Sequence, residues 1–570
     1  MGSRRIAAAL VAAGCLLAMP AVAGLAAGPG NTPFWIGLSD PGQVDQQVSR
    51  MLAERAVTIA VRLADGGDGG RAVVARLKKA APQTPVLMYA WASRNLRGRP
   101  GSAGIIDWLD QHPEWQINTG WGRALAGFPD VTNAAFQSRL AGSIAGAVAR
   151  GGFDGVALDL AIRTPRYRPG PLARLCKADA TFCRNYAAGM DATFDAIRGS
   201  LRGKAVLYNG IWNQGPGSVD DQLLLLAHAD AAIVEFFGGD VKGDSRGFSQ
   251  DVLPYLQAMA KVPDDKKLFV FGRASRQYDA YAEDYARQRY LYCAYLLGAR
   301  KNTYFKYHAT FQSGVPEGRS GGLSIYADWS TNLGAPSKAY AVQANIYSRP
   351  FAHGLVVVAP DDGSGGSFTL PRTMYSPEGD TYSGTVALRP GQGLLLLDAK
   401  PAEDNDQHLL DLRLASDWPA ATLGGTAAAP VLDLQPAAAG AHDLLLDPIR
   451  TPRPRKLLRL GVRPTDASAG IDLLVEVDDS ERRSQWAMIH IGVKGAAGSG
   501  NGASAIGFRM RSPARAAMPL VSGPSVTAGN WQNLELDGAA LLAKSGLTFR
   551  RWDFARFNGA IQVRAVTLAR

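Results

Sequence analysis

The chain has 570 residues, of which 46% are hydrophobic and 19% charged, and its formal net charge is +11. This length and composition indicate a globular protein of two or three domains with sizeable cores. A basic surface could favour an anionic glycan or cell surface, although a basic secreted protein without a specific polyanionic partner is the favoured interpretation. Nucleic acid is disfavoured because no basic run is interleaved with aromatic residues.

The first 23 residues have the pattern of a cleaved secretory signal peptide. Two arginines precede an apolar run over residues 6–19, and residues 21–23 form a small-x-small cleavage site. Cys15 faintly resembles a lipoprotein cysteine, although the apolar run continues beyond it. Neither this run nor any later stretch is long enough to span a membrane, so we expect a secreted or periplasmic protein.

Residues 31–335 predict an α/β domain, a (β/α)₈ TIM barrel. Eight short apolar runs alternate with helical patterns over about 300 residues, as this fold requires. A doubly wound open sheet is the alternative, although no glycine-rich phosphate fingerprint follows the first strand. The eight strand candidates are FWIGLSD (34–40), TIAVRLAD (58–65), PVLMYAWAS (85–93), GVALDLAI (155–162), AVLYNG (205–210), AAIVEFFG (231–238), KLFVFGRA (267–274) and NTYFKYHAT (302–310).

The fourth strand carries a carboxylate at each end. Asp154 directly precedes GVALD and Asp159 ends it, so the two lie on opposite rims of any sheet. In a TIM barrel the C-terminal rim carries the chemistry and the N-terminal rim carries stability. Asp159 is therefore predicted to be catalytic and Asp154 structural. Inward-facing Ala157 would alternate with outward-facing Val156 and Leu158.

The sixth strand repeats this arrangement, with Asp230 before it and Glu235 near its end. Two carboxylates at one rim are what glycosidic cleavage requires, because one protonates the leaving oxygen and the other attacks carbon or activates water. The alternative for Glu235 is that it only binds substrate or pairs with a neighbouring Arg or Lys. Further candidates for substrate binding at the same rim are Asp40, Arg62, Tyr89, Trp91, Tyr208, Asn209, Arg273, Lys306 and His308.

The two loops after the third and fourth strands are long, which is common for functional loops. The first covers about residues 94–130 and holds three tryptophans and the HPEWQIN segment. The second holds Cys176 and Cys183, which we expect to form a disulfide in an oxidising compartment. Cys293 lies in an apolar helical pattern and is predicted to be a buried free thiol. No metal-ligand spacing occurs, and we expect no cofactor.

Beyond the barrel the pattern changes to β. Residues 340–400 predict a small all-β module, and residues 401–441 are rich in Ala, Gly and Pro and resemble a linker with interspersed strands. Residues 442–570 predict a β-sandwich of jelly-roll type, which could bind carbohydrate. Four tryptophans could stack on sugars there, although core packing is at least as good an interpretation for each. These are Trp418, Trp486, Trp531 and Trp552.

Several of these segments together carry a family resemblance. The segments PVLMYAWAS, HPEWQIN, FPDVTNAAFQSRL and GGFDGVALDL resemble glycoside-hydrolase-like family fifteen and, more distantly, the endo-α-1,4-polygalactosaminidases. IYSRPFAHGLVVVAP is similar to the signature of the appended β module, with His353 and Ala359 where asparagines are more usual. The resemblance covers about residues 31–400. It implies a barrel glycosidase with Asp159 and Glu235 as its pair, but Leu160 replaces the polar residue that usually follows the strand.

We therefore expect a secreted glycoside hydrolase that cleaves a bacterial exopolysaccharide, with Asp159 as nucleophile and Glu235 as acid/base of a retaining mechanism. A catalytically inactive barrel that binds glycan at the cell surface is the main alternative. A structural protein of the envelope is the third. The sugar, the linkage and the oligomeric state do not follow from the sequence.

Overall fold

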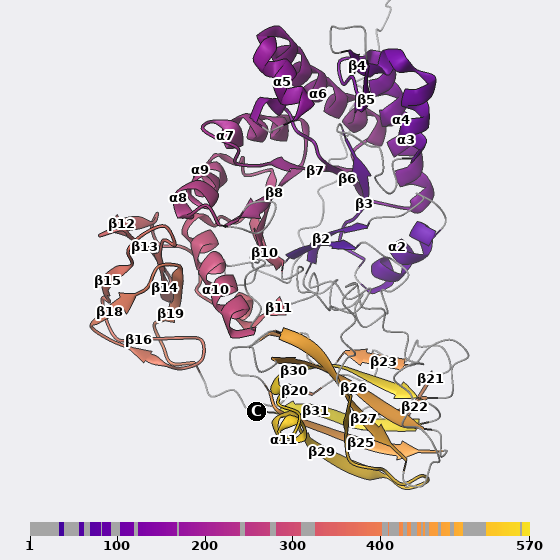
Figure 1. The fold of residues 1–570 in the computed structure, drawn as a ribbon, viewed down its shortest axis with the longest axis vertical. Helices are drawn as coiled ribbons and strands as arrows, with labels where there is room; N and C mark the ends of the chain where they lie inside the picture. The colour runs from indigo at the N-terminus through magenta and orange to yellow at the C-terminus, as the bar shows by residue number, and fades with distance from the viewer. Residues whose placement is uncertain are drawn as a thin grey trace, which may run out of the picture.

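The computed structural model describes most of residues 69–401 and the strands of the C-terminal region (Figure 1). The described residues are 34–38, 56–61, 69–80, 82–92, 103–118, 124–167, 170–239, 245–273, 281–308, 325–401, 408–409, 421–425, 430–434, 442–445, 449–450, 455–465, 469–478, 484–493, 520–558 and 561–569. The predicted signal peptide lies outside them.

Eight parallel strands form one sheet, and each corresponds to a strand expected from the sequence. The first and last strands of this order, β1 and β10, contact each other. The observed architecture is therefore α/β with an eight-stranded parallel sheet. In sheet order the strands are β1 (Phe34–Leu38), β2 (Ala56–Val61), β3 (Val86–Trp91), β6 (Gly155–Asp159), β7 (Ala205–Ile211), β8 (Ala231–Phe237), β9 (Lys267–Arg273) and β10 (Thr303–His308).

The two faces of this sheet are buried in two different cores. Val156 and Leu158 of β6 belong to the large core shared with the helices. Ala157 instead packs with Leu207 and Phe269 in a smaller core made only from strand residues. This alternation is expected for a barrel strand. The small residue faces the side of the sheet that packs only against other strands, and the branched residues face the helices.

Helices connect the strands and cover the sheet (Figure 1). They are α2 (Gly69–Ala80), α3 (Ala103–Gln111), α4 (Ala134–Gly151), α5 (Pro171–Ala178), α6 (Ala180–Leu201), α7 (Ser218–Leu223), α8 (Phe248–Asp251), α9 (Leu253–Lys261) and α10 (Tyr281–Gly298). Local sequence fixes the ends of α4, which leads into β6. The Asn133 side chain caps the first turn by accepting from Ala135 N and Phe136 N, and Gly152 ends the helix at φ 71°.

The two long segments after β3 and β6 contain more regular structure than a loop prediction allows. The first holds α3, a short 3₁₀ helix (Pro113–Trp115) and a hairpin of β4 (Gln116–Asn118) and β5 (Ala124–Pro129). The cysteine segment is not a loop either. Asp179 ends α5 and caps α6 by accepting from Thr181 N, which places the two cysteines on successive helices.

A six-stranded antiparallel sheet follows and packs against α10. Val356, Val358 and Leu395 of this sheet belong to the large core that the parallel sheet shares with its helices. The strands are β12 (Ala341–Gln343), β13 (Ile346–Phe351), β14 (Gly354–Ala359), β19 (Gln392–Leu397), β16 (Met374–Tyr375) and β17 (Thr381–Tyr382), with β15 (Gly366–Thr369) and β18 (Thr385–Leu388) forming a separate pair. We call residues 340–400 the β module.

The C-terminal region contains two antiparallel-rich sheets whose buried residues form one common core. Strands of the stretch that resembles a linker, β20 (His408–Leu409), β21 (Ala421–Gly425) and β22 (Pro430–Leu434), belong to the first sheet, so this stretch is more than a spacer. The first sheet also holds β31 (Ile561–Ala569), β25 (Leu457–Pro464) and β29 (Gln532–Asp537). The second holds β23 (His442–Leu445), β30 (Thr548–Asn558), β26 (Gly470–Asp478), β27 (Ser484–Gly492) and β28 (Leu520–Ser522).

Two short strands join this region to the preceding part of the chain. β11 (Ile325–Tyr326) pairs in parallel with β24 (Ile449–Arg450). Within the C-terminal core Trp552 is fully buried, and its Nε1 donates to Lys456 O at 3.1 Å, so this tryptophan is a core residue. The Trp531 ring has the guanidinium of Arg564 4.3 Å from its centroid. Trp418 and the Trp486 side chain lie outside the described residues.

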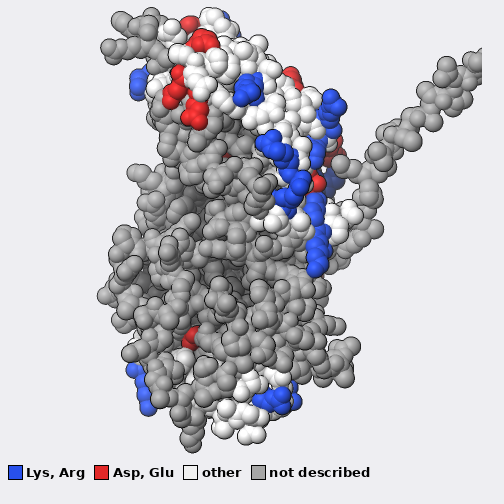
Figure 2. Space-filling view, turned by 90° about the vertical axis from the view of Figure 1, so that its right-hand side faces the viewer, with Lys and Arg blue, Asp and Glu red and all other residues white. Residues whose placement is uncertain are grey.

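The charge is mixed on the face drawn in Figure 2. Described Lys and Arg side chains run along one edge of its upper half, and a group of described acidic side chains lies near the top. Among the described residues, no helix has the length and apolar character needed to cross a membrane.

Candidate active site

One amide joins the two predicted catalytic carboxylates. Asn209 lies near the end of β7, between β6 and β8, and its Nδ2 donates to Asp159 Oδ1 and to Glu235 Oε2, each at 2.9 Å. Because both oxygens lie 2.9 Å from one nitrogen, they are no more than about 5.8 Å apart. The two N–H bonds of a planar amide diverge by about 120°, which corresponds to about 5 Å between the oxygens. Three neighbouring strands thus bring Asp159, Glu235 and Asn209 to one place.

Three donors surround the half-buried Asp159 carboxylate. Oδ1 accepts from Asn209 and from the backbone N–H of Leu160 at 2.8 Å, and Oδ2 accepts from the hydroxyl of Tyr89 on β3. Burial and the nearby negative charge of Glu235 raise the pKa of Asp159, while the three donated hydrogen bonds act in the opposite direction. The site therefore holds a carboxylate whose ionised form is disfavoured by burial and supported by specific donors.

Backbone strain follows Asp159 directly. Leu160 has φ 54°, in the left-handed region that is costly for a residue with a Cβ atom. This conformation turns the Leu160 N–H back to the Asp159 carboxylate. The next residue, Ala161, donates its N–H to Asn209 O at 3.0 Å. The strained turn thus orients both Asp159 and Asn209, and such strain is concentrated at functional sites.

Irregular strand pairing occurs beside Asn209 and beside Glu235. The β7–β8 register shifts between Asn209 and Ile211, and the β8–β9 register shifts between Val234 and Phe237, next to Glu235. Gly210 is needed at the first shift because a Cβ atom there would lie 2.0 Å from Ala161 O. Irregularities of this kind re-aim side chains and are frequent next to active sites.

An apolar cluster of three aromatic residues, one leucine and one isoleucine lies at the same end of the strands. The Trp91 ring meets Tyr89 edge-on at 5.5 Å, and the Trp212 ring lies 5.3 Å from Phe236. Apolar ring surface beside carboxylates suits a sugar, whose C–H faces stack on aromatic rings. The members of the cluster are Trp91, Leu160, Ile162, Trp212 and Phe236. Sequence reasoning missed Trp212, although it follows β7 directly in YNGIWN and could have been found by extending that strand.

Lys306 on β10 is buried beside the ring of Phe271, with its Nζ 5.4 Å from the ring centroid. Burial lowers its pKa to about 7. The paired register of β9 and β10 places Lys306 opposite Phe271 and His308 opposite Arg273. The side chains of Arg273 and His308, and the whole of Asp40 and Arg62, lie outside the described residues.

Tyr208 does not belong to the site. It is completely buried in the helix-facing core, and its hydroxyl donates to Gln222 O at 2.9 Å. Successive side chains of a strand point to opposite faces of the sheet. Tyr208 faces the helices, so its neighbour Asn209 faces the other side, where Asp159 and Glu235 lie. The prediction that placed both at the rim was wrong for Tyr208.

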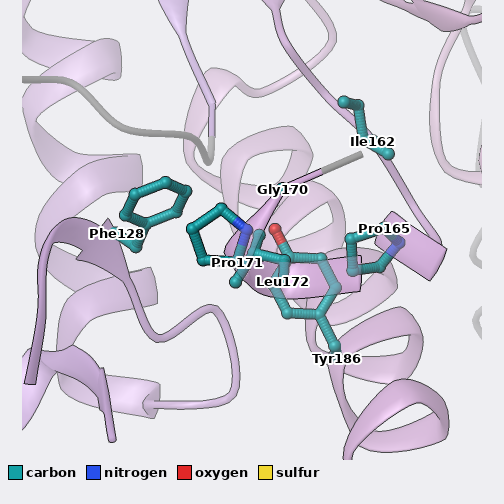
Figure 3. A pocket seen from close by; sticks show the side chains of 7 residues that line it. All are labelled: Phe128, Ile162, Pro165, Gly170, Pro171, Leu172 and Tyr186. Carbon is teal, nitrogen blue, oxygen red and sulfur yellow. The ribbon is translucent and has the colours of Figure 1, made fainter. Parts of the chain in front are cut away.

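A small pocket lies beside the segment after β6 (Figure 3). Ile162, a member of the apolar cluster, and Phe128 of β5 lie on opposite sides of it. Neither Asp159 nor Glu235 lines this pocket, so it is separate from the site around Asn209. Its lining residues are Phe128, Ile162, Pro165, Gly170, Pro171, Leu172 and Tyr186.

The cysteines behave as the sequence predicts. Cys176 and Cys183 form a disulfide, and Cys293 is a buried free thiol whose pKa is raised by burial. The described part of the chain contains no group of three or more His, Cys, Asp or Glu side chains that could hold a metal ion.

Comparison with solved structures gives distant similarities to glycoside hydrolases. The glycoside hydrolase domain of PelA from Pseudomonas aeruginosa is 13% identical, with 45% of this chain and 90% of that chain covered and a TM-score of 0.30. The maltogenic alpha-amylase AmyB from Thermotoga neapolitana is 9% identical, with coverages of 65% and 96% and a TM-score of 0.39. Sequence identities and TM-scores this low give no information on the substrate or mechanism of this protein. No curated protein matches the chain.

A family model gives a direct match. The model of hypothetical glycosyl hydrolase family 15 matches residues 78–355, a range that contains β3 to β10 and all the described residues of the site. This region of the chain therefore matches a glycosyl hydrolase family, which confirms both the resemblance seen in the sequence motifs and the predicted enzyme class.

Proposed function

We propose that the protein is a secreted, retaining glycoside hydrolase that cleaves a bacterial exopolysaccharide, with its site at the C-terminal rim of a closed (β/α)₈ barrel. The observation that carries this proposal is the Asn209 amide shared by Asp159 and Glu235. Retaining enzymes hold their carboxyl groups about 5–5.5 Å apart, whereas inverting enzymes need about 6.5–9.5 Å to admit a water molecule. The spacing imposed by one amide fits the first class.

Asp159 is the nucleophile in this mechanism. It ends β6 at the strained Leu160 turn, and its three donors favour the ionised form that attacks the anomeric carbon. A carboxylate has about four acceptor positions, so three hydrogen bonds leave a lone pair for attack. Tyr89 and Asn209 also supply the polar contacts that the apolar Leu160 cannot supply, so the leucine after Asp159 is compatible with catalysis.

Glu235 is the acid and then the base. Its proton passes to the leaving glycosidic oxygen as Asp159 bonds to the anomeric carbon, which gives a covalent glycosyl-enzyme intermediate. The ionised Glu235 then takes a proton from water, which attacks the same carbon and releases Asp159. Asn209, which donates to both residues, keeps them aligned through both steps. Trp91 and Trp212 supply the apolar wall for the sugar ring.

We assign the C-terminal region, with its two sheets around one core, to a β-sandwich of jelly-roll type that binds carbohydrate. It lies outside residues 78–355. The predicted signal peptide and the Cys176–Cys183 disulfide support an exported protein.

The test is reducing-sugar release from a panel of bacterial exopolysaccharides, with Asp159→Asn beside the wild type. We expect the wild type to release reducing sugar and Asp159→Asn to release none. Proton NMR should show that the first product formed has the same anomeric configuration as the substrate. Inversion would overturn the retaining assignment. Binding of a polysaccharide without release would instead favour the inactive glycan-binding barrel.

A further inference from the structure

The turn after β14 reaches from the β module to the loop that follows the strand of Glu235. We propose that Asp361 and Asp362 in this turn are positioning residues that hold the C-terminal ends of β7 and β8 in place. The inference deepens the proposed function and depends on it, because Asn209 and Glu235 stand at those two ends. The β module would then be an integral part of the active site.

Asp361 is the first contact. Its Oδ2 accepts from Ser245 Oγ at 2.7 Å and from Arg287 Nη1 at 3.1 Å, and its Oδ1 accepts from Tyr290 OH at 3.2 Å. Arg287 is buried, and its Nη2 donates to the carbonyl of Gly238, three residues after Glu235. One guanidinium thus links the β module to the end of β8. Burial alone would raise the pKa of Asp361, but Arg287 and the donated hydrogen bonds outweigh it and lower that pKa.

Asp362 is the second contact. Its Oδ2 accepts from Ser249 N at 2.9 Å and from Ser249 Oγ at 2.6 Å, at the start of α8. Gly247 has φ 98°, and a Cβ atom there would lie 2.6 Å from Asp362 Cβ. Only glycine satisfies both the conformation and the close approach. The ring of Phe248 adds an apolar contact to Tyr347 of β13, with centroids 4.6 Å apart.

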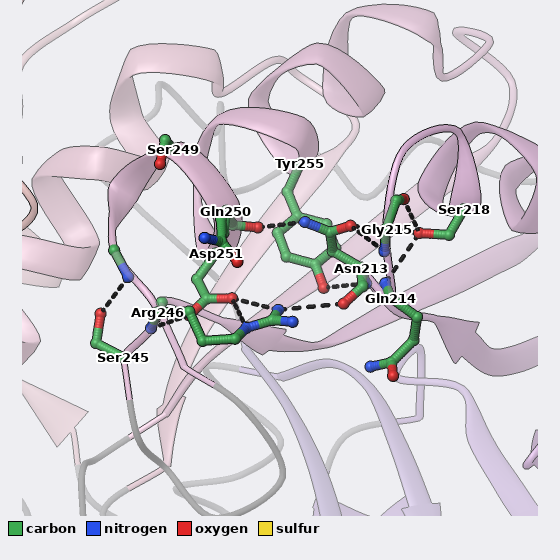
Figure 4. A network of polar contacts seen from close by, with 12 residues as sticks. Asn213, Gln214, Gly215, Ser218, Ser245, Arg246, Ser249, Gln250, Asp251 and Tyr255 are labelled. Atoms are coloured by element: carbon green, nitrogen blue, oxygen red, sulfur yellow. Dashed lines mark hydrogen bonds and ion pairs between the residues drawn. The ribbon is translucent and has the colours of Figure 1, made fainter. Parts of the chain in front are cut away.

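The segment held by these two aspartates is bound in turn to both strand ends, and Figure 4 shows its contacts with Asn213 after β7. Arg246 Nε donates to the fully buried Asp251 at 2.8 Å, and its Nη2 donates to Asn213 O at 3.1 Å. Asp251 O accepts from Gly238 N at 2.8 Å. Asn213 follows Asn209 by four residues, and Gly238 follows Glu235 by three. The segment 245–251 therefore fixes the chain just after each site residue.

Support of this kind is needed because the strand ladder is interrupted there. The register shifts at residues 209–211 and 234–237 remove regular pairing from the backbone that carries Asn209 and Glu235. Catalytic groups must be held within about 0.5 Å of their productive positions. Contacts from the β module replace the missing pairing and complete the site from outside the sheet.

The direct test is hydrogen–deuterium exchange measured by mass spectrometry on the full-length protein. In Asp361→Asn and Asp362→Asn, we expect about tenfold faster exchange in peptides that contain Asn213, Gly238 and Ser249, because charged hydrogen bonds are lost. Asp398→Asn is the matched control. It breaks an ion pair with Arg372, at 2.5 Å, inside the same β module. Its exchange at these peptides should equal that of the wild type. Unchanged exchange in both turn variants would overturn the proposal.

Activity supplies the second readout, on the polysaccharide that the wild type hydrolyses. If Asp361 holds the strand ends in place, kcat should fall about ten- to a hundredfold in Asp361→Asn while KM stays nearly constant. Faster exchange with wild-type kcat would overturn the positioning role. If the wild type hydrolyses nothing in the panel, the proposed function fails, and the exchange result still decides whether the turn holds these strand ends. If Asp361→Asn does not fold, Ser249→Ala removes a single hydroxyl contact to Asp362 and gives the milder variant.

Discussion

The two rims of the parallel sheet use carboxylates in opposite ways. At the N-terminal rim, Asp154 accepts from Val86 N at 2.8 Å and pairs with Lys78 at 2.6 Å, and Asp230 accepts from Val206 N at 2.9 Å and pairs with Arg198 at 3.1 Å. Each joins the start of a neighbouring strand to a cation on a helix.

At the C-terminal rim, Asp159 and Glu235 have each other as neighbouring charge, and one neutral amide lies between them. We therefore propose that carboxylates on the same two strands stabilise the fold at one rim and react with substrate at the other. The difference lies in the surroundings, because Asp154 and Asp230 each lie beside a cation, whereas burial and the charge of Glu235 raise the pKa of Asp159.

The largest expected effect comes from Asp159→Asn. Removal of the nucleophile should lower kcat by about three orders of magnitude or more, because no covalent intermediate can form. Asp154→Asn, on the same strand, should leave kcat within about twofold of the wild type. Initial rates of reducing-sugar release measure both. Equal losses in the two variants would erase the functional difference between the rims.

Glu235→Gln should have a smaller effect that depends on the leaving group. Loss of the general acid should lower hydrolysis of the polysaccharide by about 10²–10⁴-fold. An aryl glycoside of the same sugar with a good leaving group should still form the glycosyl-enzyme, because its departure needs no proton. Burst kinetics and mass spectrometry detect that intermediate. Failure on both substrates would argue against Glu235 as the acid.

Asp230→Asn tests the structural rim. Loss of a charge-assisted hydrogen bond and an ion pair should lower the free energy of unfolding by about 1–3 kcal/mol, with little change in kcat. Denaturant unfolding of the full chain measures this. A stability equal to that of the wild type would contradict the role assigned to this rim.

The smallest expected effect is a shift in pH dependence. Burial and Glu235 raise the pKa of Asp159, and the Tyr89 hydrogen bond lowers it. Because the nucleophile must be ionised, activity should fall as the pH drops through that pKa. Tyr89→Phe removes a donor to the ionised form, so its acidic limb of kcat/KM should move to higher pH, with less than about tenfold loss at the optimum. A shift to lower pH would contradict the assignment.

Much of the sheet and the core of the site could be predicted from the sequence because both depend on local pattern. Apolar runs located all eight strands, and the ends of two of them located Asp159 and Glu235. The prediction was wrong for Tyr208 because side chains alternate between the two faces of a sheet. An error of one residue in the alternation therefore assigns a side chain to the opposite face. The positive φ of Leu160 has no sequence signal, since leucine rarely adopts it.

Contacts between distant segments were beyond sequence reasoning. Ser245 and Asp361 are 116 residues apart in sequence, and neither residue carries a motif. The sequence predicts loops in the two long segments after β3 and β6 because polar and glycine-rich flanks obscure the helices inside them, which are α3, α5 and α6. Sequence pattern therefore locates the two carboxylates that we propose to be catalytic, whereas the proposed positioning residues emerge only from the tertiary structure.

The central claim, that the two rims have opposite functions, is tested most directly by thermal unfolding of Asp159→Asn and Asp154→Asn at pH 7. The raised pKa of Asp159 means that the folded protein binds this proton more tightly than the unfolded chain does. Its ionised form therefore costs stability above that pKa, and the neutral amide removes the cost. Asp159→Asn should raise the midpoint of unfolding, whereas Asp154→Asn should lower it through loss of the Lys78 pair and the Val86 contact. A lower midpoint for Asp159→Asn, or an unchanged one for Asp154→Asn, would contradict the division between the rims.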